Sequence, residues 1–346
     1  MKKAMNELEY TPDLMHDYII KNRKMLLAYD PEADYDIWKE QVRTKLDELL
    51  GDHPIKAKDH DFVLEWEKEH DTFIERRFTF YSEEFTRVPC HLWLPKSGKA
   101  PYPVVICLQG HSSGMHISMG RVKYDEDVEI ISGGDRDFAI QIVKEGYAAL
   151  VIEQRGFGER VTPRHYGPSK TTCTNPAITA ILLGRTILRE RAFDISVAID
   201  MLDNFSDIDK DKIALMGNSG GGTATYYTAC FEPRIKVVMP SCAVCSFEYS
   251  IGTLRHCICN HVPNMAKYMD MGEIACLIAP RPLIVVAGEK DHGFLYPGVQ
   301  KVYKVIEQIY AKEGAPDNCK LVTGPEGHRF YADLSWGVFR KYFMGE

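Results

Sequence analysis

The sequence of 346 residues lacks several features that would place it in a specialised class of protein. No uninterrupted apolar run approaches the roughly 20 residues of a membrane span. No run rich in lysine and arginine stands out, and the net charge is −7, so we expect neither nucleic acid nor a membrane as a partner. No internal repeat or low-complexity stretch is visible. These absences favour an ordinary soluble globular protein.

The first nine residues also lack the apolar core of a secretory signal peptide. The chain nevertheless contains ten cysteines. Cysteines without an export signal are typical of reduced thiols in a cytoplasm, because disulfides persist mainly in oxidising compartments. The sequence therefore predicts a cytoplasmic location.

One group of cysteines and histidines raises the question of a zinc site. Its members are Cys242, Cys245, His256, Cys257, Cys259 and His261. The Cys-x-Cys spacing suits a tetrahedral metal site poorly, and Cys242 follows a predicted buried strand. We therefore predict buried, unreactive thiols and no bound metal, with zinc as the alternative.

What the chain does contain is the make-up of a globular enzyme, 45% hydrophobic and 26% charged residues, long enough for one large domain or two modest ones. Residues 1–60 show helical spacing of apolar side chains, which predicts helices over 13–28 and 36–50, the second ending at Gly51. We interpret residues 1–60 as an N-terminal helical extension that packs on the main domain or on a second subunit. A homo-oligomer is thus left open.

From residue 61 the pattern changes to strands. Three alternating stretches predict antiparallel strands at a sheet edge, and continuously apolar runs alternating with helices follow. The predicted strands after the edge are 103–108, 147–152, 213–216, 235–239, 282–287 and 318–322. One long helix is expected over 176–202. Residues 61–346 are therefore predicted to form an α/β domain with a mostly parallel central sheet of about eight strands and helices on both faces.

The stretch between strand 213–216 and the next helix carries the strongest chemical signal. It reads Gly217-Asn218-Ser219-Gly220-Gly221, a Gly-x-Ser-x-Gly motif in the strand–turn–helix context that this motif requires. Small neighbours let the strand turn sharply, which lifts the Ser219 hydroxyl above the sheet near the unpaired N–H groups of the helix. We predict that Ser219 is a nucleophile. The alternative is a structural serine in a glycine-rich turn.

A serine nucleophile needs a base and a carboxylate that orients the base. The loop after strand 282–287 contains Asp291, our predicted carboxylate, with Glu289 as the alternative. The loop after strand 318–322 contains His328, our predicted general base, while His292 is a competitor beside the acid. The chain order Ser219, Asp291, His328 fits one of the folds that use this triad.

The reaction also needs N–H donors for the oxyanion of the tetrahedral intermediate. Gly220 N–H follows the nucleophile directly. The loop after strand 103–108 is expected to supply the second donor, because Gly110 permits close backbone approach; we predict His111 N–H, with Ser112 as the alternative. For the His111 side chain, packing or hydrogen bonding is favoured over a contact with substrate.

These motifs resemble the α/β-hydrolase superfamily, and within it the acetyl-xylan-esterase and dienelactone-hydrolase-like bacterial esterases. The resemblance covers roughly residues 75–343. It rests on the stretches 108–113, 153–160, 183–194, 217–222, 279–283, 288–291 and 327–328. The chain departs from dienelactone hydrolases, which use a cysteine nucleophile. It also departs from xylan deacetylases, which have Arg-Gly-Gln where this chain has Arg155-Gly156-Phe157 and Gly-x-Ser-Gln-Gly at the elbow.

The resemblance implies further roles. Arg155 would brace the loops around the elbow, with binding of a substrate carboxylate as the alternative, and Asn218 and Gly110 would support the site. Residues 241–279 would form a lid or insert. Its candidate pocket residues, which ordinary core packing would explain equally well, are Phe247, Tyr249, Leu254, His256, Met265, Tyr268 and Met269.

Together these observations predict a serine carboxylic-ester hydrolase that forms an acyl-enzyme and requires no cofactor. By resemblance, we expect a small-molecule ester as substrate, with small acyl groups of the acetyl type on a carbohydrate or other alcohol. A peptidase or acyltransferase using the same triad is an alternative, as is a ligand-binding protein without turnover.

Overall fold

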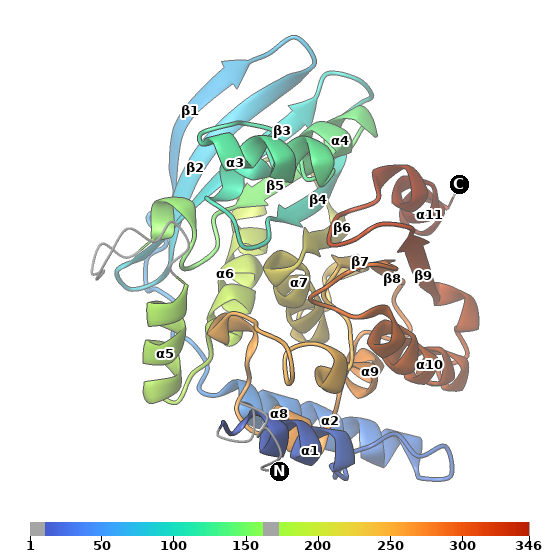
Figure 1. The fold of residues 1–346 in the computed structure, drawn as a ribbon. Helices are drawn as coiled ribbons and strands as arrows, with labels where there is room; N and C mark the ends of the chain where they lie inside the picture. Colours follow the sequence, from blue (N-terminus) through green and yellow to red (C-terminus); the bar gives the residue numbers. More distant parts are fainter. Residues whose placement is uncertain (1–10, 162–172, 346) are drawn as a thin grey trace.

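The computed structural model describes residues 11–161 and 173–345. These residues form a nine-stranded sheet in the order β1-β2-β3-β5-β4-β6-β7-β8-β9 (Figure 1). The strands are β1 (Val63–Glu69), β2 (Phe73–Glu83), β3 (Thr86–Pro95), β4 (Tyr102–Leu108), β5 (Ala148–Ile152), β6 (Ile208–Asn218), β7 (Ile235–Ser241), β8 (Leu283–Gly288) and β9 (Cys319–Gly324). The sequence predicted about eight strands in the central sheet, so the count is slightly higher than expected.

Helices cover both faces of the sheet, as the sequence predicted (Figure 1). The α-helices among the described residues are α1 (Asp13–Asn22), α2 (Tyr35–Leu50), α3 (Asp125–Val128), α4 (Phe138–Lys144), α5 (Thr174–Leu182), α6 (Ile187–Met201), α7 (Gly220–Phe231), α8 (Met265–Tyr268), α9 (Met271–Ile274), α10 (Tyr296–Lys312) and α11 (Ala332–Met344). Successive strand residues point to opposite faces, so Val104 and Ile106 join one core with α6, α7 and α10. Val105 and Cys107 join the other core, with α4 and α11.

The two halves of the sheet differ in strand direction. Strands β1, β2 and β3 pair antiparallel with one another, and β3 pairs antiparallel with β5. Every pairing from β5 to β9 is parallel. Because parallel strands present their carboxyl ends at one edge, the loops after β4, β6, β8 and β9 all emerge at the same rim.

The expected single helix over 176–202 is in fact two helices, and this prediction was wrong. Helix α5 ends before Gly184, which adopts a φ of +76° that few other residues tolerate. Thr186 then begins α6, and its side chain accepts a hydrogen bond from Arg189 N–H at 3.2 Å. The apolar periodicity continues across this break, which is why the sequence pattern concealed it.

The N-terminal extension packs on the main domain. Trp38, Val42, Leu46 and Leu50 of α2 are buried in the same core as α6 and α7. Helix α2 lies beside α8 and α9 of the 241–279 segment. Helix α1 ends at Asn22 rather than at residue 28, and none of its residues is buried. The prediction that the N-terminus has no signal peptide concerns residues 1–10, which lie outside the described residues.

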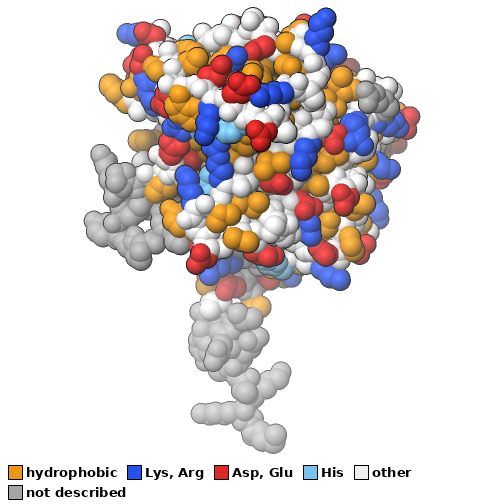
Figure 2. Space-filling model, turned by 90° about the horizontal axis from the view of Figure 1, so that it is seen from above, with side chains coloured by type: hydrophobic (Ala, Val, Ile, Leu, Met, Phe, Trp, Pro, Cys, Tyr) orange, Lys and Arg blue, Asp and Glu red, His pale blue; other side chains and the backbone are white. Residues whose placement is uncertain are grey.

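Charged side chains of both signs lie on the face of the molecule shown in Figure 2. On the face shown in Figure 2, acidic and basic side chains are interspersed, and neither sign forms a continuous patch there. Within residues 11–161 and 173–345, every helix is too short or too polar to cross a bilayer.

Candidate active site

The turn between β6 and α7 holds Ser219 in a strained conformation. Its φ of 55° and ψ of −123° lie outside the regions that residues with a side chain normally occupy, which costs on the order of 1–3 kcal/mol. The turn is possible because its neighbours are glycines: a Cβ on Gly217 would lie 2.5 Å from Gly221 O, and one on Gly221 would lie 2.3 Å from Leu108 O. Ser219 N–H donates to Ser241 O at 2.8 Å, which anchors the turn to β7.

The predicted acid and base are hydrogen-bonded to each other. His328 Nδ1 lies 2.8 Å from Asp291 Oδ2, and Asp291 is 3% exposed. The Gly293 and Phe294 amides donate to Asp291 Oδ1 at 2.8 and 3.1 Å. Burial alone would raise the pKa of Asp291, but the hydrogen bond and charge of His328 and the two amides outweigh it and lower the pKa. Asp291 is thus held as a carboxylate facing His328.

The two competing residues lie outside this pair. Glu289 and His292 are both exposed at the surface. The His292 ring centre lies 6.1 Å from that of His328. By contrast, the Phe294 ring stacks on His328 with an angle of 12° between the planes, which fixes the orientation of the imidazole.

A buried arginine links the His328 loop to the serine turn. Arg136 is 9% exposed, and its Nη2 donates to His328 O at 2.8 Å. If the Asn218 amide is turned so that its nitrogen donates to Ser241 Oγ at 2.9 Å, its oxygen accepts from Arg136 Nη2 at 3.3 Å and from Ser219 N–H at 3.2 Å. Sequence reasoning missed Arg136, because it lies in an irregular segment before α4 that carries no motif.

Ser219 is only partly buried. Among the hydrogen bonds of the described residues, none joins Ser219 Oγ to the His328 ring. Such bonds are often long without substrate and tighten in the substrate complex. With Nδ1 engaged by Asp291, His328 Nε2 is the ring nitrogen left to act on a hydroxyl.

The loop after β4 packs directly on the serine turn. A Cβ on Gly110 would lie 3.0 Å from Ser219 Cβ, and one on Gly220 would lie 2.8 Å from the His111 ring. Gly110 therefore lies against the serine turn, and the His111 ring lies against Gly220. In the described part of the chain, the N–H groups of His111 and Gly220 donate to no protein acceptor. Ser112, the alternative donor, is buried, and its hydroxyl donates to Gly110 O at 3.3 Å.

A buried carboxylate supports both ends of this loop. Glu153, at the end of β5, accepts hydrogen bonds from Gln109 Nε2 at 2.9 Å and from Met115 N–H at 3.0 Å. Burial raises the pKa of Glu153 to about 7, although the Met115 and Glu159 amides act in the opposite direction. Glu153 was part of the resemblance motif, but sequence reasoning did not assign it a role.

Arg155 is fully engaged by carboxylates of the protein. Its guanidinium lies 2.8 Å from Glu83, 3.1 Å from Glu190 and 2.7 Å from Asp194. These partners belong to β2 and α6, so Arg155 ties the loop after β5 to elements away from the serine. This arrangement leaves Arg155 no free hydrogen-bonding face for a substrate carboxylate.

The 241–279 segment is a packed insert. Phe247, Met265 and Met269 are buried in the main core, and Tyr249 and Tyr268 pack against it. Leu254 and His256 are partly exposed, and His256 Nε2 lies 2.8 Å from Gly293 O on the loop that carries Asp291. The insert therefore contacts the acid loop directly.

The cysteines of this insert fall into two groups. Cys242 and Cys245 are buried, and their thiols donate to the backbone carbonyls of Arg329 and Leu295 at 3.2 and 3.5 Å. Cys259 is buried as well, but Cys257 is only partly buried, so the prediction of buried thiols was wrong for that residue. Cys257 and Cys259 lie beside His111 and Cys173, a grouping that the sequence analysis did not find.

His256 and His261, the other members of the suspected zinc group, face elsewhere. His256 Nε2 contacts Gly293 O, and His261 Nδ1 lies 3.1 Å from Cys257 O. The zinc alternative built on these two histidines is therefore not supported.

The chain is similar in sequence to known proteins. The model of the Abhydrolase family matches residues 13–326. Over 293 residues the chain is 29% identical to "Putative hydrolase YtaP" of Bacillus subtilis (strain 168). This alignment covers 83% of this chain and 92% of that protein. The family match begins at residue 13 and so includes the N-terminal helices. The resemblance noted from the sequence motifs covered only residues from about 75 onward.

Solved structures with the same fold include several esterases. A "putative acetyl xylan esterase" from Bacteroides fragilis NCTC 9343 superposes with a TM-score of 0.75 at 16% identity, covering 99% of this chain and 97% of that one. A glucuronoyl esterase from Solibacter usitatus superposes with a TM-score of 0.66 at 14% identity, covering 92% of this chain and 95% of that one. At these identities the likeness establishes the fold, and the predicted α/β-hydrolase fold is confirmed.

Proposed function

Because the chain belongs to the Abhydrolase family, we propose that it is a serine carboxylic-ester hydrolase with Ser219, His328 and Asp291 as its catalytic triad. The observation that carries this proposal is the hydrogen bond of 2.8 Å between His328 Nδ1 and Asp291 Oδ2, formed at the rim of the sheet where the strained turn presents Ser219. A structural serine would not require a backbone conformation that costs free energy.

The chemistry proceeds in two halves. Ser219 Oγ attacks the ester carbonyl while His328 Nε2 accepts the hydroxyl proton, and Asp291 stabilises the imidazolium that forms. The His328 proton then passes to the leaving alcohol as the tetrahedral intermediate collapses to an acyl-enzyme. In the second half His328 activates a water molecule, which releases the acid and restores the serine.

The oxyanion of each tetrahedral intermediate is bound by the N–H groups of Gly220 and His111. Support comes from the absence of a protein acceptor for either group in residues 11–161 and 173–345, and from the close approach of Gly110 to Ser219 in the serine turn. Gly220 N–H also lies at the start of α7, where the helix dipole favours negative charge. Each such donor contributes about 3 kcal/mol of barrier stabilisation in enzymes of this kind.

The proposed substrates are esters of small acyl groups, of the acetyl type, with a carbohydrate or another small alcohol. Solved structures of the same fold carry the names acetyl xylan esterase, glucuronoyl esterase and methylesterase, which supports an ester of a carbohydrate. Recognition of an acidic sugar would have to come from a residue other than Arg155, because that guanidinium is already occupied.

The test compares hydrolysis of p-nitrophenyl acetate by the native protein and by the Ser219→Ala variant. We expect the variant to lose at least about 10⁴-fold in kcat, because the nucleophile is absent. Ser132→Ala, at an exposed serine away from the turn, is the matched control and should retain full activity. Equal rates in the native protein and Ser219→Ala would refute the proposal. If Ser219→Ala loses activity as expected, a panel of sugar acyl esters tests which substrate the native protein prefers.

A further inference from the structure

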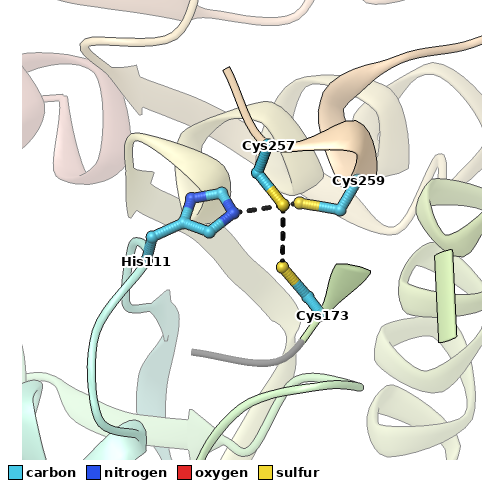
Figure 3. A group of neighbouring side chains, drawn as sticks. All are labelled: His111, Cys173, Cys257 and Cys259. Atoms are coloured by element: carbon cyan, nitrogen blue, oxygen red, sulfur yellow. Dashed lines mark hydrogen bonds between the residues drawn. The ribbon is translucent and has the colours of Figure 1, made fainter. Parts of the chain in front are cut away.

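A second cluster of reactive side chains lies beside the oxyanion loop. It consists of His111 on the loop after β4, Cys173 directly before α5, Cys257 directly before the short 3-10 helix η7 (Ile258–Asn260), and Cys259 within that helix (Figure 3). His111 Nε2 lies 3.0 Å from Cys259 Sγ, and Cys173 Sγ lies 3.0 Å from Cys257 Sγ. All four ligand atoms lie within 4.8 Å of one another.

The donor set is that of a structural zinc site. Three thiolates and one imidazole are a common tetrahedral combination, and bonds of about 2.3 Å to sulfur and 2.0 Å to nitrogen separate the ligand atoms by roughly 3.5–3.8 Å. The observed separations run from 3.0 Å to at most 4.8 Å and so bracket this range. In Figure 3 the four side chains converge on one point, with Cys257 and Cys259 coming from the same segment and His111 and Cys173 each from another.

The surroundings supply a matching charge. Arg191 of α6 is 1% exposed, and its Nε and Nη2 both donate to Arg155 O, at 3.2 and 2.8 Å. Its Nη1 has no hydrogen-bond partner, and no salt bridge to Arg191 occurs within the described residues. The guanidinium lies over the Phe157 ring, 4.5 Å from its centre, and Phe157 packs in the same apolar cluster as Cys173 and Cys259. A buried guanidinium without a carboxylate is costly unless another negative group lies near it.

We propose that His111, Cys173, Cys257 and Cys259 bind one zinc-class divalent cation in a closed, four-ligand site. Binding releases the thiol protons, and any proton on the ligating His111 nitrogen, to solvent. Three thiolates and a neutral imidazole around a dication leave one negative charge, which the buried Arg191 behind the Phe157 ring would partly offset. Because four protein ligands complete the coordination, the site is structural and offers no open position for water or substrate.

The position of the site gives it a role in the proposed function, and this part of the inference depends on that function. His111 donates its backbone N–H to the proposed oxyanion hole, while its ring lies against Gly220. A cation on His111 Nε2 would fasten this loop to α5 and to the insert. The cation would thereby hold the donor in place before substrate binds, which is the condition for electrostatic stabilisation.

The test measures metal in the full-length protein purified without chelators. We expect about one zinc per chain, and after exchange with Co²⁺ the intense thiolate-to-cobalt absorption of a tetrahedral site. Cys257→Ser and Cys173→Ser should each lose at least 10-fold in metal affinity. Cys245→Ser, which changes a buried thiol of the same insert outside the cluster, should bind as the native protein does.

Two results would overturn the metal site. One is a native protein that contains no stoichiometric metal and fails to bind added Zn²⁺ or Co²⁺. The other is a disulfide between Cys173 and Cys257, found by mass spectrometry of the protein kept under reducing conditions throughout. Circular dichroism reports whether each variant is folded, and Co²⁺ titration of the native protein needs no variant. Labelling of Ser219 by a fluorophosphonate tests the proposed function separately from the metal.

Discussion

The two sides of the proposed active site are built in different ways. On one side, Asp291 and His328 follow adjacent parallel strands, and the buried carboxylate of Asp291 orients the His328 imidazole through one hydrogen bond. On the other side, the proposed oxyanion loop is held by Glu153, which follows the adjacent parallel strand β5, and also by the cluster of His111 with Cys173, Cys257 and Cys259. Strand order therefore brings Asp291 to His328 and Glu153 to the loop, whereas the three cysteines come from segments that lie outside the sheet.

The largest effect should come from the base. His328→Ala removes the proposed acceptor of the Ser219 proton, so we expect kcat for p-nitrophenyl acetate to fall by about 10⁴-fold or more. His292→Ala, on an exposed residue of the acid loop, should stay within twofold of the native rate. If the two variants lost equal activity, the base would have to be reassigned. Steady-state kinetics of both proteins decide the matter.

A slightly smaller loss should follow when the carboxylate is neutralised. Asp291→Asn keeps the size of the side chain but no longer favours the His328 tautomer whose Nε2 accepts a proton, so kcat should fall by about 10³- to 10⁴-fold. Glu289→Gln on the same loop is the matched control, and its rate should be unchanged. A large loss in Glu289→Gln with little in Asp291→Asn would make Glu289 the acid.

The oxyanion side should respond more mildly. Loss of the proposed cation in Cys257→Ser loosens the His111 loop without removing a reacting group, so we expect kcat to fall by about 10- to 100-fold with KM within about twofold. Cys245→Ser should retain native values. An unchanged kcat in a folded, metal-free Cys257→Ser would separate the metal site from catalysis and leave the triad proposal intact.

The smallest effect concerns stability and pH. The pKa of Glu153 is raised to about 7, so the folded state holds this proton above the ordinary carboxyl pKa, and stability from this group falls as pH rises from about 4.5 through 7. Glu153→Gln cannot ionise, so its loss of stability between pH 5 and pH 8 should be smaller by about 1–2 kcal/mol than that of the native protein.

Urea unfolding at the two pH values measures this difference. Glu159→Gln is the control, because salt bridging to Arg77 lowers the pKa of Glu159 and places its titration below this window. An identical pH response in the native protein and Glu153→Gln would show that Glu153 is ionised throughout.

The sequence anticipated the acid–base side well, because its signals are local. A buried strand followed by Asp or His at a loop start places the side chain at a known rim, and Asp291 and His328 are hydrogen-bonded there as predicted. The glycines also allowed the serine turn to be predicted, because steric crowding leaves room for no other residue type at Gly217 and Gly221.

The oxyanion side could be predicted only in part. The approach of Gly110 to the turn followed from its residue type. The grouping of Cys173 with Cys257 and Cys259 was not predicted, because it requires the chain to break between α5 and α6 at Gly184. That break depends on the positive φ of Gly184, which the apolar periodicity does not reveal. The sequence likewise gives no sign that Arg191 is buried in α6 with its Nη1 lacking a hydrogen-bond partner.

The edge strand β1 has a consequence for how the protein behaves at high concentration. Every residue from Val63 to Glu69 is exposed, and the strand pairs on one side only, so its other side presents free backbone groups to any copy that approaches. Glu65, Glu67 and Glu69 form salt bridges with Arg77, Arg76 and Lys96, and such charged side chains along an exposed edge oppose growth of the sheet from one molecule into the next.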